Sequence, residues 1–562
     1  MNLPKKMEDY SRDELINIIN ANEAIVAKNS RDISAIKLLT QAHLRLANFQ
    51  AAAQTLSNLL KIDATQIWAY HELANILQRF AKPEEAKDMI RQALLVDSKN
   101  AQSHTLFGTL LAEENNLIAG EWHFRRALEL SPDNPKIQSK LALSLVQQGK
   151  TDEAYTLYQR ASELAPNDFE IIAHWSKLCE VTGNLKQADT LLKKASKIAS
   201  PTAVDLLRSS YLARIGQHQQ AIDIISISKN PSGDALLERG RAYDRLGQYD
   251  NAWQDFVSGK NKILHEAPGL EYQTSAIEKF FTELTSFFSA DMLHQLPRAS
   301  VRGACPQPIF ILGSPRSGTT LTERALSAHS EIVAGGELTF IAELRELTNK
   351  ILPTPTFPKN LAYSCTADFR QLATLFRDHY LARAESAGLL NSKAKYFTDK
   401  MPFNEIYLPI IKMAFPESPI IQLTRNPLDI SVSMISHRIN HGFHCAYRVE
   451  NIFHHLNAVH NLTRHYSAVM SGVMDSNILP LKYENFVDQQ EQETRNMINH
   501  IGLPFEAACL SFHSNKSYTP TPSYIQVQSK VTDSAIERYK NYRTHLQTYQ
   551  TEFATLISAQ GY

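Results

Sequence analysis

The hydrophobic pattern of the first half of the chain repeats every 34 residues, with small side chains at fixed places among larger apolar ones. Two antiparallel helices pack closely only where small side chains face each other, and a single hairpin cannot bury its apolar face alone. The pattern therefore predicts a stack of helical hairpins. Three series of small residues keep this spacing: Ala52, Ala86, Gly120, Ala154 and Ala188; Ala93, Ala127, Ala161 and Ala195; and Ala74, Gly108, Ala142 and Ser176.

Glycines mark the expected ends of these helices. Gly149, Gly183, Gly216 and Gly247 fall where one helix is predicted to end and the next to begin. The period and the pattern match those of the tetratricopeptide repeat, and about seven units fit. We therefore expect an N-terminal helical cap at 1–34 and a tetratricopeptide array at 35–260. Such an array binds a protein or peptide ligand, or alternatively pairs two subunits of a homodimer.

The repeat pattern ends near residue 260. The next segment, 261–305, contains a phenylalanine-rich apolar stretch that predicts connecting helices. No run of about 18 apolar residues occurs, so no membrane span is expected. The first residues lack the apolar stretch of a secretory signal, and we therefore expect a cytoplasmic protein.

Composition and charge exclude several classes of protein. Hydrophobic residues make up 43% of the chain, which excludes disorder as its main state. Lys+Arg and Asp+Glu are both 58, so the chain has no basic excess and no nucleic-acid partner is expected. The five cysteines form no CxxC pair, which disfavours a disulfide scaffold or a zinc knuckle. Any anion site must therefore be local.

A strand, a tight loop and a helix are predicted in succession from Pro308 to His329. Residues 309–312 are an apolar run, and the loop of small residues extends from Gly313 to Gly318. Backbone N–H groups at such a loop, together with the helix dipole, attract an anion. The spacing mimics a P-loop, but Thr319 stands where a nucleoside-triphosphatase has lysine. Arg316 offers a cation within the loop instead.

The loop sequence GSPRSGTT resembles the 5′-phosphosulfate loop of sulfotransferases that use 3′-phosphoadenosine-5′-phosphosulfate (PAPS). The resemblance is closer to the protein-tyrosine sulfotransferase branch and to bacterial sulfotransferases with N-terminal tetratricopeptide repeats. It covers Pro308 to about Arg543 and implies a multidomain chain: an all-α tetratricopeptide solenoid plus an α/β, P-loop-like sulfotransferase domain with a central parallel sheet at 306–562. It implies that these loop residues contact PAPS: Ser314, Pro315, Arg316, Ser317, Gly318, Thr319 and Thr320.

Three further motifs extend the resemblance. In GGELTF, Glu337 matches the proposed catalytic base of the tyrosine branch, and in TDKMPFN, Lys400 matches a lysine at the transferring sulfonate. In IIQLTRNPLDISVSMISHR, Arg425 and Ser433 match the 3′-phosphate site. This chain departs from the family in having His437 four residues after Ser433, where the tyrosine branch has a basic residue.

Two later segments resemble the family less closely. Tyr483, in LPLKYENF, matches a tyrosine that contacts the nucleotide. Ser523 and Lys530 match a terminal segment that closes over the cofactor. Both segments extend the expected contacts with PAPS and with its product, 3′-phosphoadenosine 5′-phosphate (PAP).

The chemistry of sulfonate transfer explains why these residue types are needed. Charge accumulates on the departing phosphate, and catalysis rests on positioning and electrostatic stabilisation. Arg316 and Lys400 supply positive charge, and Glu337 takes the proton of the acceptor hydroxyl. This residue set requires no metal. Seven histidines lie between His437 and His465, and we interpret them as solvated helix faces rather than as metal ligands.

The sequence leaves the acceptor open between protein tyrosine and a carbohydrate, a lipid or a small molecule. A different class of function is a non-catalytic repeat scaffold with a nucleotide-binding domain. All the nucleotide motifs lie beyond Pro308. We therefore expect a fragment that starts near Ser300 to retain affinity for PAP.

Overall fold

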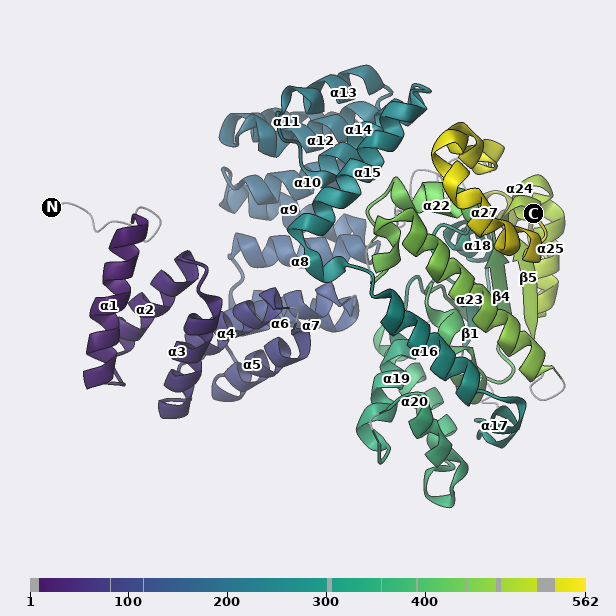
Figure 1. Cartoon of the computed structure of the whole chain (residues 1–562), viewed down its shortest axis with the longest axis horizontal. Helices are drawn as coiled ribbons and strands as arrows, with labels where there is room; N and C mark the ends of the chain where they lie inside the picture. Colours follow the sequence, from purple (N-terminus) through teal and green to yellow (C-terminus); the bar gives the residue numbers. More distant parts are fainter. Residues whose placement is uncertain are drawn as a thin grey trace. The chain divides into compact units, whose positions relative to one another are not determined.

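The computed structural model describes residues 10–80, 82–114, 116–300, 306–354, 356–390, 393–439, 442–471, 477–512 and 531–562. The chain divides into two compact units, Met1–His174 and Trp175–Tyr562. The first unit consists of helices, and the second unit combines further helical pairs with the sheet (Figure 1). Within the described residues, no helix is both long and apolar enough to cross a membrane.

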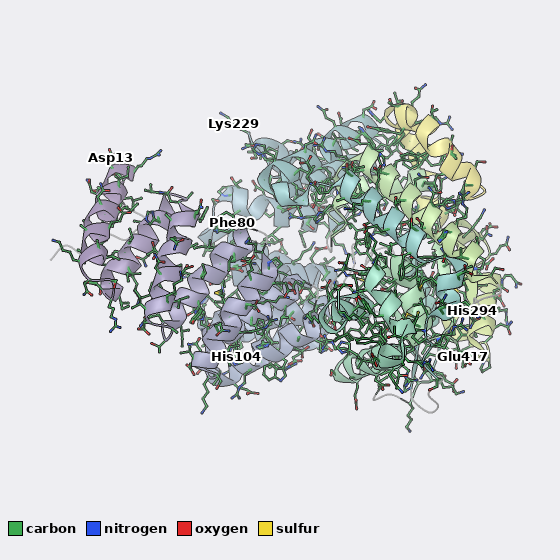
Figure 2. All side chains as sticks on the ribbon, turned by 60° about the horizontal axis from the view of Figure 1, so that its bottom comes forward. Asp13, Phe80, His104, Lys229, His294 and Glu417 are labelled. Atoms are coloured by element: carbon green, nitrogen blue, oxygen red, sulfur yellow. The ribbon has the colours of Figure 1, made fainter. Side chains whose placement is uncertain are left out.

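The first unit begins with a single helix, and four helical pairs follow it. Gly108 and Gly120 show why small residues recur, because a Cβ atom on Gly108 would lie 3.0 Å from the carbonyl oxygen of Gly120. Ala52 and Ala86 are completely buried. Phe80 (Figure 2) and Trp122 stay exposed, but scattered apolar side chains are ordinary on protein surfaces. The helices are α1 (Arg12–Lys28), α2 (Ile33–Arg45), α3 (Phe49–Ile62), α4 (Ile67–Arg79), α5 (Pro83–Val96), α6 (Ala101–Glu113), α7 (Leu117–Leu130), α8 (Pro135–Gln147) and α9 (Thr151–Leu164).

Three more pairs follow, so the described residues contain seven pairs in all. The expected glycine turns are confirmed, because Gly183, Gly216 and Gly247 end their helices with φ angles of +83°, +82° and +74°. A left-handed residue at this position closes a helix end, and glycine adopts it without a Cβ clash. The helices are α10 (Phe169–Val181), α11 (Leu185–Ile198), α12 (Pro201–Arg214), α13 (His218–Ile227), α14 (Gly233–Arg245) and α15 (Tyr249–Glu266).

The second unit also holds the predicted central parallel sheet. Its strands lie in the order β2-β3-β1-β4-β5, and every described pairing is parallel. In β1, Phe310 is opposite Asp399 of β3 and Ile420 of β4. The strands are β1 (Gln307–Leu312), β2 (Ile332–Val333), β3 (Tyr396–Asp399), β4 (Ile420–Thr424) and β5 (Ile478–Lys482).

Helices cover both faces of the sheet. On one face, Ile309 and Ile421 share a buried cluster with Leu326 of α18 and Ile498 of α25. On the other face, the ring of Phe310 packs against Tyr380 of α20. The remaining helices are α16 (Thr274–Phe287), α17 (Ala290–Gln295), α18 (Thr319–Leu326), α19 (Phe340–Ile351), α20 (Leu372–Ser386), α21 (Leu408–Ala414), α22 (Pro427–Ile435), α23 (Val449–Met470), α24 (Tyr483–Asp488), α25 (Gln490–Ile501) and α27 (Arg543–Ala559).

The last repeat pair shares its hydrophobic core with the helices beside the sheet. Phe256 of α15 belongs to one buried cluster with Val432 of α22, Ile452 of α23 and Phe553 of α27. The ring of Tyr542, just before α27, lies 5.7 Å from that of Trp253 in α15. A fragment that starts near Ser300 would leave this core open. This open core argues against the expectation that such a fragment retains affinity for PAP.

Candidate functional site

A loop between β1 and α18 brings Gly313 to Gly318 to the carboxyl end of the central strand. Gly318 has a φ of +105°, and a Cβ atom there would lie 2.4 Å from the ring of Tyr483. Helix α18 then begins at Thr319, as the sequence predicts. The N–H groups of its first turn have no intrahelical partner, so this end of the helix favours an anion.

We expect Gly318→Ala to lower the free energy of unfolding by more than the roughly 1–2 kcal/mol that a left-handed L-residue costs. The excess comes from the collision of the new methyl group with Tyr483. Gly388→Ala is a matched control, because Gly388 has a φ of +76° with no atom within 4 Å of the added Cβ. Thermal unfolding of both variants measures the difference. Equal losses would mean that the ring of Tyr483 does not constrain the loop.

Four strand ends converge around this loop. Lys400 directly follows β3, Arg425 directly follows β4 and Tyr483 directly follows β5. Because these strands are parallel neighbours of β1 or of each other, their carboxyl ends lie at the same edge of the sheet. After β1 the chain forms β2 and β3 on one side of that strand, and it then crosses to form β4 and β5 on the other side. A parallel sheet binds ligands at such a switch point.

Arg316 and Arg425 form a cationic group at this edge. The Nε atom of Arg316 donates a hydrogen bond to the Oγ of Ser433 at 2.8 Å, and Arg425 donates to the carbonyl oxygen of Arg316 at 2.8 Å. The guanidinium of Arg425 lies 4.4 Å from the centre of the Tyr483 ring. Burial, together with nearby guanidinium groups such as those of Arg425 and Arg538, lowers the pKa of Arg316 to about 9.

Two polar atoms in and beside this cationic group have no hydrogen-bond partner among the described residues. They are the Oγ of Ser317 and the Nε of Arg425, and both are buried. Buried polar groups are almost always satisfied in folded proteins. Unsatisfied groups on the loop and on the neighbouring arginine therefore fit an anionic ligand at this edge.

A second group consists of Glu337 and Lys400. The Nζ of Lys400 donates to a carboxylate oxygen of Glu337 at 2.6 Å, and the side chains are 1% and 26% exposed, respectively. Burial acts to lower the pKa of Lys400, but the carboxylates of Glu337 and Glu323 outweigh it and raise the pKa above its usual value. Lys400 therefore stays charged, and Glu337 is the member that reaches the surface.

Close backbone contacts hold Glu337 against β3. The N–H of Gly335 donates to the Oγ1 of Thr398 at 3.0 Å, and a Cβ atom on Gly335 would lie 2.1 Å from the carbonyl oxygen of Thr398. The N–H of Lys400 donates to the carbonyl oxygen of Gly336 at 2.9 Å. Only glycine at position 335 allows this approach, and Gly336 has a φ of +74°, a left-handed state that favours glycine.

Sequence analysis missed two buried acids near the site. Glu323 of α18 accepts hydrogen bonds from the N–H of Gly336 at 3.0 Å and from the hydroxyl of Thr398 at 2.7 Å, so it ties the loop of Glu337 to β3. The sequence could have indicated Glu323, because it is an acid on a helix that is otherwise buried. Glu405 lines a small cavity beside the loop, and burial raises its pKa to about 8. No motif indicated Glu405.

The terminal segment also contributes to the site. The carboxylate of Asp429 accepts the N–H groups of Glu537 and Tyr539, at 2.8 and 2.9 Å. Arg425 donates to the carbonyl oxygen of Ala535. These contacts hold the segment against the first turn of α22. The predicted contacts Ser523 and Lys530 lie outside the described residues.

Only part of the histidine cluster forms the solvated faces that the sequence suggested: His454 is exposed, but His437 and His455 are not. His455 is buried among aromatic rings, and burial lowers its pKa to about 4. Burial and neighbouring arginines, Arg316 first among them, hold the pKa of His437 well below its usual value. His437 is therefore neutral and does not replace the family's basic residue. His441 and Cys305 lie outside the described residues, which contain no group of three or more His, Cys, Asp or Glu able to hold a metal ion.

Comparisons with known proteins match both the repeat region and the region that contains the sheet. Residues 308–507 match the model of the sulfotransferase family, and residues 111–174 match that of a tetratricopeptide repeat. An uncharacterized protein from Aquifex aeolicus (strain VF5) is 25% identical over 327 residues, which cover 57% of this chain. The match spans only 41% of that relative's length. The chain therefore contains a sulfotransferase-family domain and tetratricopeptide repeats.

Solved structures that resemble the chain include repeat proteins. A tetratricopeptide repeat protein from Parabacteroides merdae ATCC 43184 is 14% identical, covers 43% of this chain and 93% of its own, and gives a TM-score of 0.37. Yeast Tom70 is 17% identical, covers 45% of this chain and 55% of its own, and gives a TM-score of 0.35.

Proposed function

We propose that the sulfotransferase-family domain of this chain transfers a sulfonate group from PAPS to a hydroxyl acceptor, with Glu337 as the general base. The observation that carries the proposal is the placement of the Glu337–Lys400 pair at the strand edge that also holds the anion loop and Arg425. A domain that only bound a nucleotide would not need a partly exposed carboxylate held by a buried ammonium at that edge. This pairing disfavours the non-catalytic scaffold.

The described residues fit a donor that has anionic groups at both ends. The N–H groups of the loop, with Ser317, Thr319 and Thr320, are suited to its 5′ end, and Arg425, Ser433 and Tyr483 to its nucleotide end. When bound, PAPS supplies an activated sulfonate and a leaving phosphate. We place Arg316 at the nucleotide end, because its side chain turns to Ser433.

The carboxylate of Glu337 is the exposed part of the Glu337–Lys400 pair, so it can accept the proton of an acceptor hydroxyl. A phenol has a pKa of about 10 and is protonated at neutral pH, so it needs a base as its new bond forms. Glu337 is the exposed member of the pair, and Lys400 behind it keeps a positive charge at the reacting centre. Together the two residues supply the base and part of the positive field.

We propose a protein acceptor that the repeats bind, with tyrosine as the first candidate. Stacked repeats of this kind present extended concave surfaces that bind other proteins, and Glu337 follows two glycines as in the tyrosine branch. Carbohydrate, lipid and small-molecule hydroxyls are the competing acceptors. A sulfonation assay with labelled PAPS and one acceptor from each class separates them.

We expect the protein to bind PAP more tightly than AMP, because only PAP has a 3′-phosphate for Arg425 and Ser433. Arg425→Ala should weaken PAP binding by roughly 1.5–3 kcal/mol, the usual value of a hydrogen bond to a charged group. Calorimetry measures both affinities. Arg495→Ala is a control, because Arg495 is an exposed arginine that pairs with Glu491 on α25. Equal affinity of the unmodified protein for PAP and AMP would contradict the proposed donor.

A further inference from the structure

Two basic side chains of the last repeat pair reach the carboxyl end of α22, and burial lowers the pKa of one of them, Lys260, to about 7. Arg241 of α14 donates a hydrogen bond to the carbonyl oxygen of Ser436 at 2.9 Å, and Lys260 of α15 donates to that of His437 at 2.6 Å. Helix α22 ends at Ile435, so these carbonyl groups have no partner within the helix. Cations stabilise such a helix end because it carries a partial negative charge.

The same end of α22 belongs to the donor site. Ser433 lies in its last turn and accepts the hydrogen bond of Arg316. The hydroxyl of Ser436 donates to the carbonyl oxygen of Ser433 at 3.2 Å, and the Nδ1 atom of His437 lies 3.0 Å from that same oxygen. The carbonyl groups that Arg241 and Lys260 hold are therefore one helical turn from the residue that positions Arg316.

Arg241 also adds to the positive charge around Arg316. Burial lowers the pKa of Arg316 most, and the guanidinium groups of Arg425, Arg538 and Arg241 lower it further. Arg538 is paired with Asp244 of α14 at 3.1 Å, so the last repeat approaches this cluster at two points. Like charges gathered in a partly buried place are unfavourable unless an anion balances them. The cluster therefore suits a ligand with more than one negative charge.

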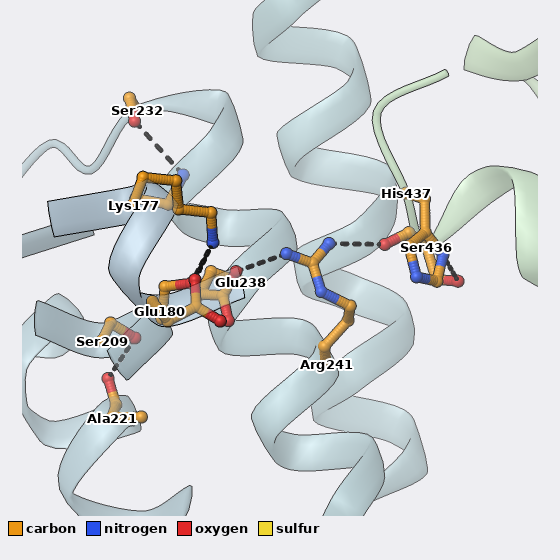
Figure 3. A network of polar contacts seen from close by, with 11 residues as sticks. Lys177, Glu180, Ser209, Ala221, Ser232, Glu238, Arg241, Ser436 and His437 are labelled. Carbon is orange, nitrogen blue, oxygen red and sulfur yellow. Dashed lines mark hydrogen bonds and ion pairs between the residues drawn. The ribbon is translucent and has the colours of Figure 1, made fainter. Parts of the chain in front are cut away.

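The repeats hold Arg241 from the other side. Arg241 forms an ion pair with Glu238 of the same helix (Figure 3). Burial acts to raise the pKa of Glu238, but Arg241 and Lys177 outweigh it and lower the pKa, so Glu238 stays ionised. Lys177 of α10 is itself paired with Glu180. Arg241 is thus fixed between an anionic partner in the repeats and a helix end in the donor site.

We propose that Arg241 and Lys260 are positioning residues of the donor site. They fix the end of α22, and through it Ser433 and Arg316, in the arrangement that selects a nucleoside 3′,5′-bisphosphate over a nucleoside 5′-phosphate. This inference rests on the proposed function. It gives the last repeat pair a part in donor recognition, in addition to any acceptor that the array binds.

The test uses the full chain and measures the affinities for PAP and AMP by calorimetry. Arg241→Met should reduce the ratio of the two affinities by at least about tenfold, the lower end of what a hydrogen bond to a charged group contributes. Arg241→Lys should restore most of the ratio, since it keeps the charge and a donor. Lys260→Met tests the same helix end independently and replaces Arg241→Met if that protein is insoluble.

Arg239→Met is the matched control. Arg239 lies on the same helix and makes a bidentate pair with Asp255, at 2.7 and 2.8 Å, within the repeat pair. Its loss should lower the melting temperature and leave the PAP-to-AMP ratio unchanged. A fall in the ratio for Arg239→Met as large as for Arg241→Met would overturn the inference, because general destabilisation would then explain both.

Two other results bear on the proposal in different ways. If the unmodified protein prefers PAP and both Arg241→Met and Lys260→Met keep that preference, the inference is wrong and the proposed donor stands. If the unmodified protein shows no preference, the proposed donor fails and the inference fails with it.

Discussion

Glu337→Gln should lower the turnover of the donor-saturated protein by at least tenfold and toward roughly 10²–10⁴-fold, the range that a positioned general base contributes. Glutamine has the shape of glutamate and can still accept the hydrogen bond of Lys400. It cannot take the proton of an acceptor hydroxyl. Affinity for PAP should be retained, because Glu337 and Lys400 form a group separate from the Arg316–Ser433 contact.

Turnover is measured with labelled PAPS, and PAP affinity is measured on the same preparation. Glu417→Gln is the control, because Glu417 is exposed in the loop before β4. Undiminished turnover in Glu337→Gln would transfer the role of base to another group. A parallel loss of turnover and PAP affinity would instead indicate that the substitution disturbs the whole site.

A fragment of residues 300–562 should aggregate, whereas a fragment of residues 232–562 should be soluble and unfold cooperatively. The longer fragment keeps α14 and α15, and with them Leu237 and Phe256, which share one core with α22, α23 and α27. It begins at Ser232, the N-cap of α14. Without these helices the buried faces of Val432 and Tyr542 become exposed apolar surface, which favours association.

Circular dichroism during heating and the binding of a hydrophobic dye distinguish the two fragments. Cooperative unfolding of residues 300–562 at the same temperature as residues 232–562 would show that the last repeat pair is dispensable for the core. An aggregated longer fragment would show that the shared core requires repeats further upstream.

The family resemblance led to the expected parallel sheet, whereas the features that the residue pattern alone predicted correctly are local ones. The 34-residue period fixes the close contacts between neighbouring helices, as at Gly108 and Gly120, so it identifies the repeat pairs without long-range information. The strand, loop and helix around Gly318 are likewise contiguous, and the glycines of the loop predict its tight turn.

The features that the sequence could not show depend on distant partners. Arg241 and Ser436 are 195 positions apart, and no period or motif links them. The histidines looked polar in the sequence, yet His455 is buried because Phe403 and Phe443 pack around it. Arg316 has a φ of +70°, and its side chain donates a hydrogen bond to Ser433. An arginine in the sequence does not predict this left-handed backbone conformation.

The shared core of the last repeat pair has a consequence for how such chains can vary in evolution. Repeats upstream of α14 interact mainly with their neighbours, so whole units can be gained or lost there without a change at the sheet. The pair α14–α15 has no such freedom, since it packs against α22, α23 and α27. The number of repeats is thus free to change while the last one is fixed. A chimera that exchanges the array for another should be joined at the segment between α13 and α14.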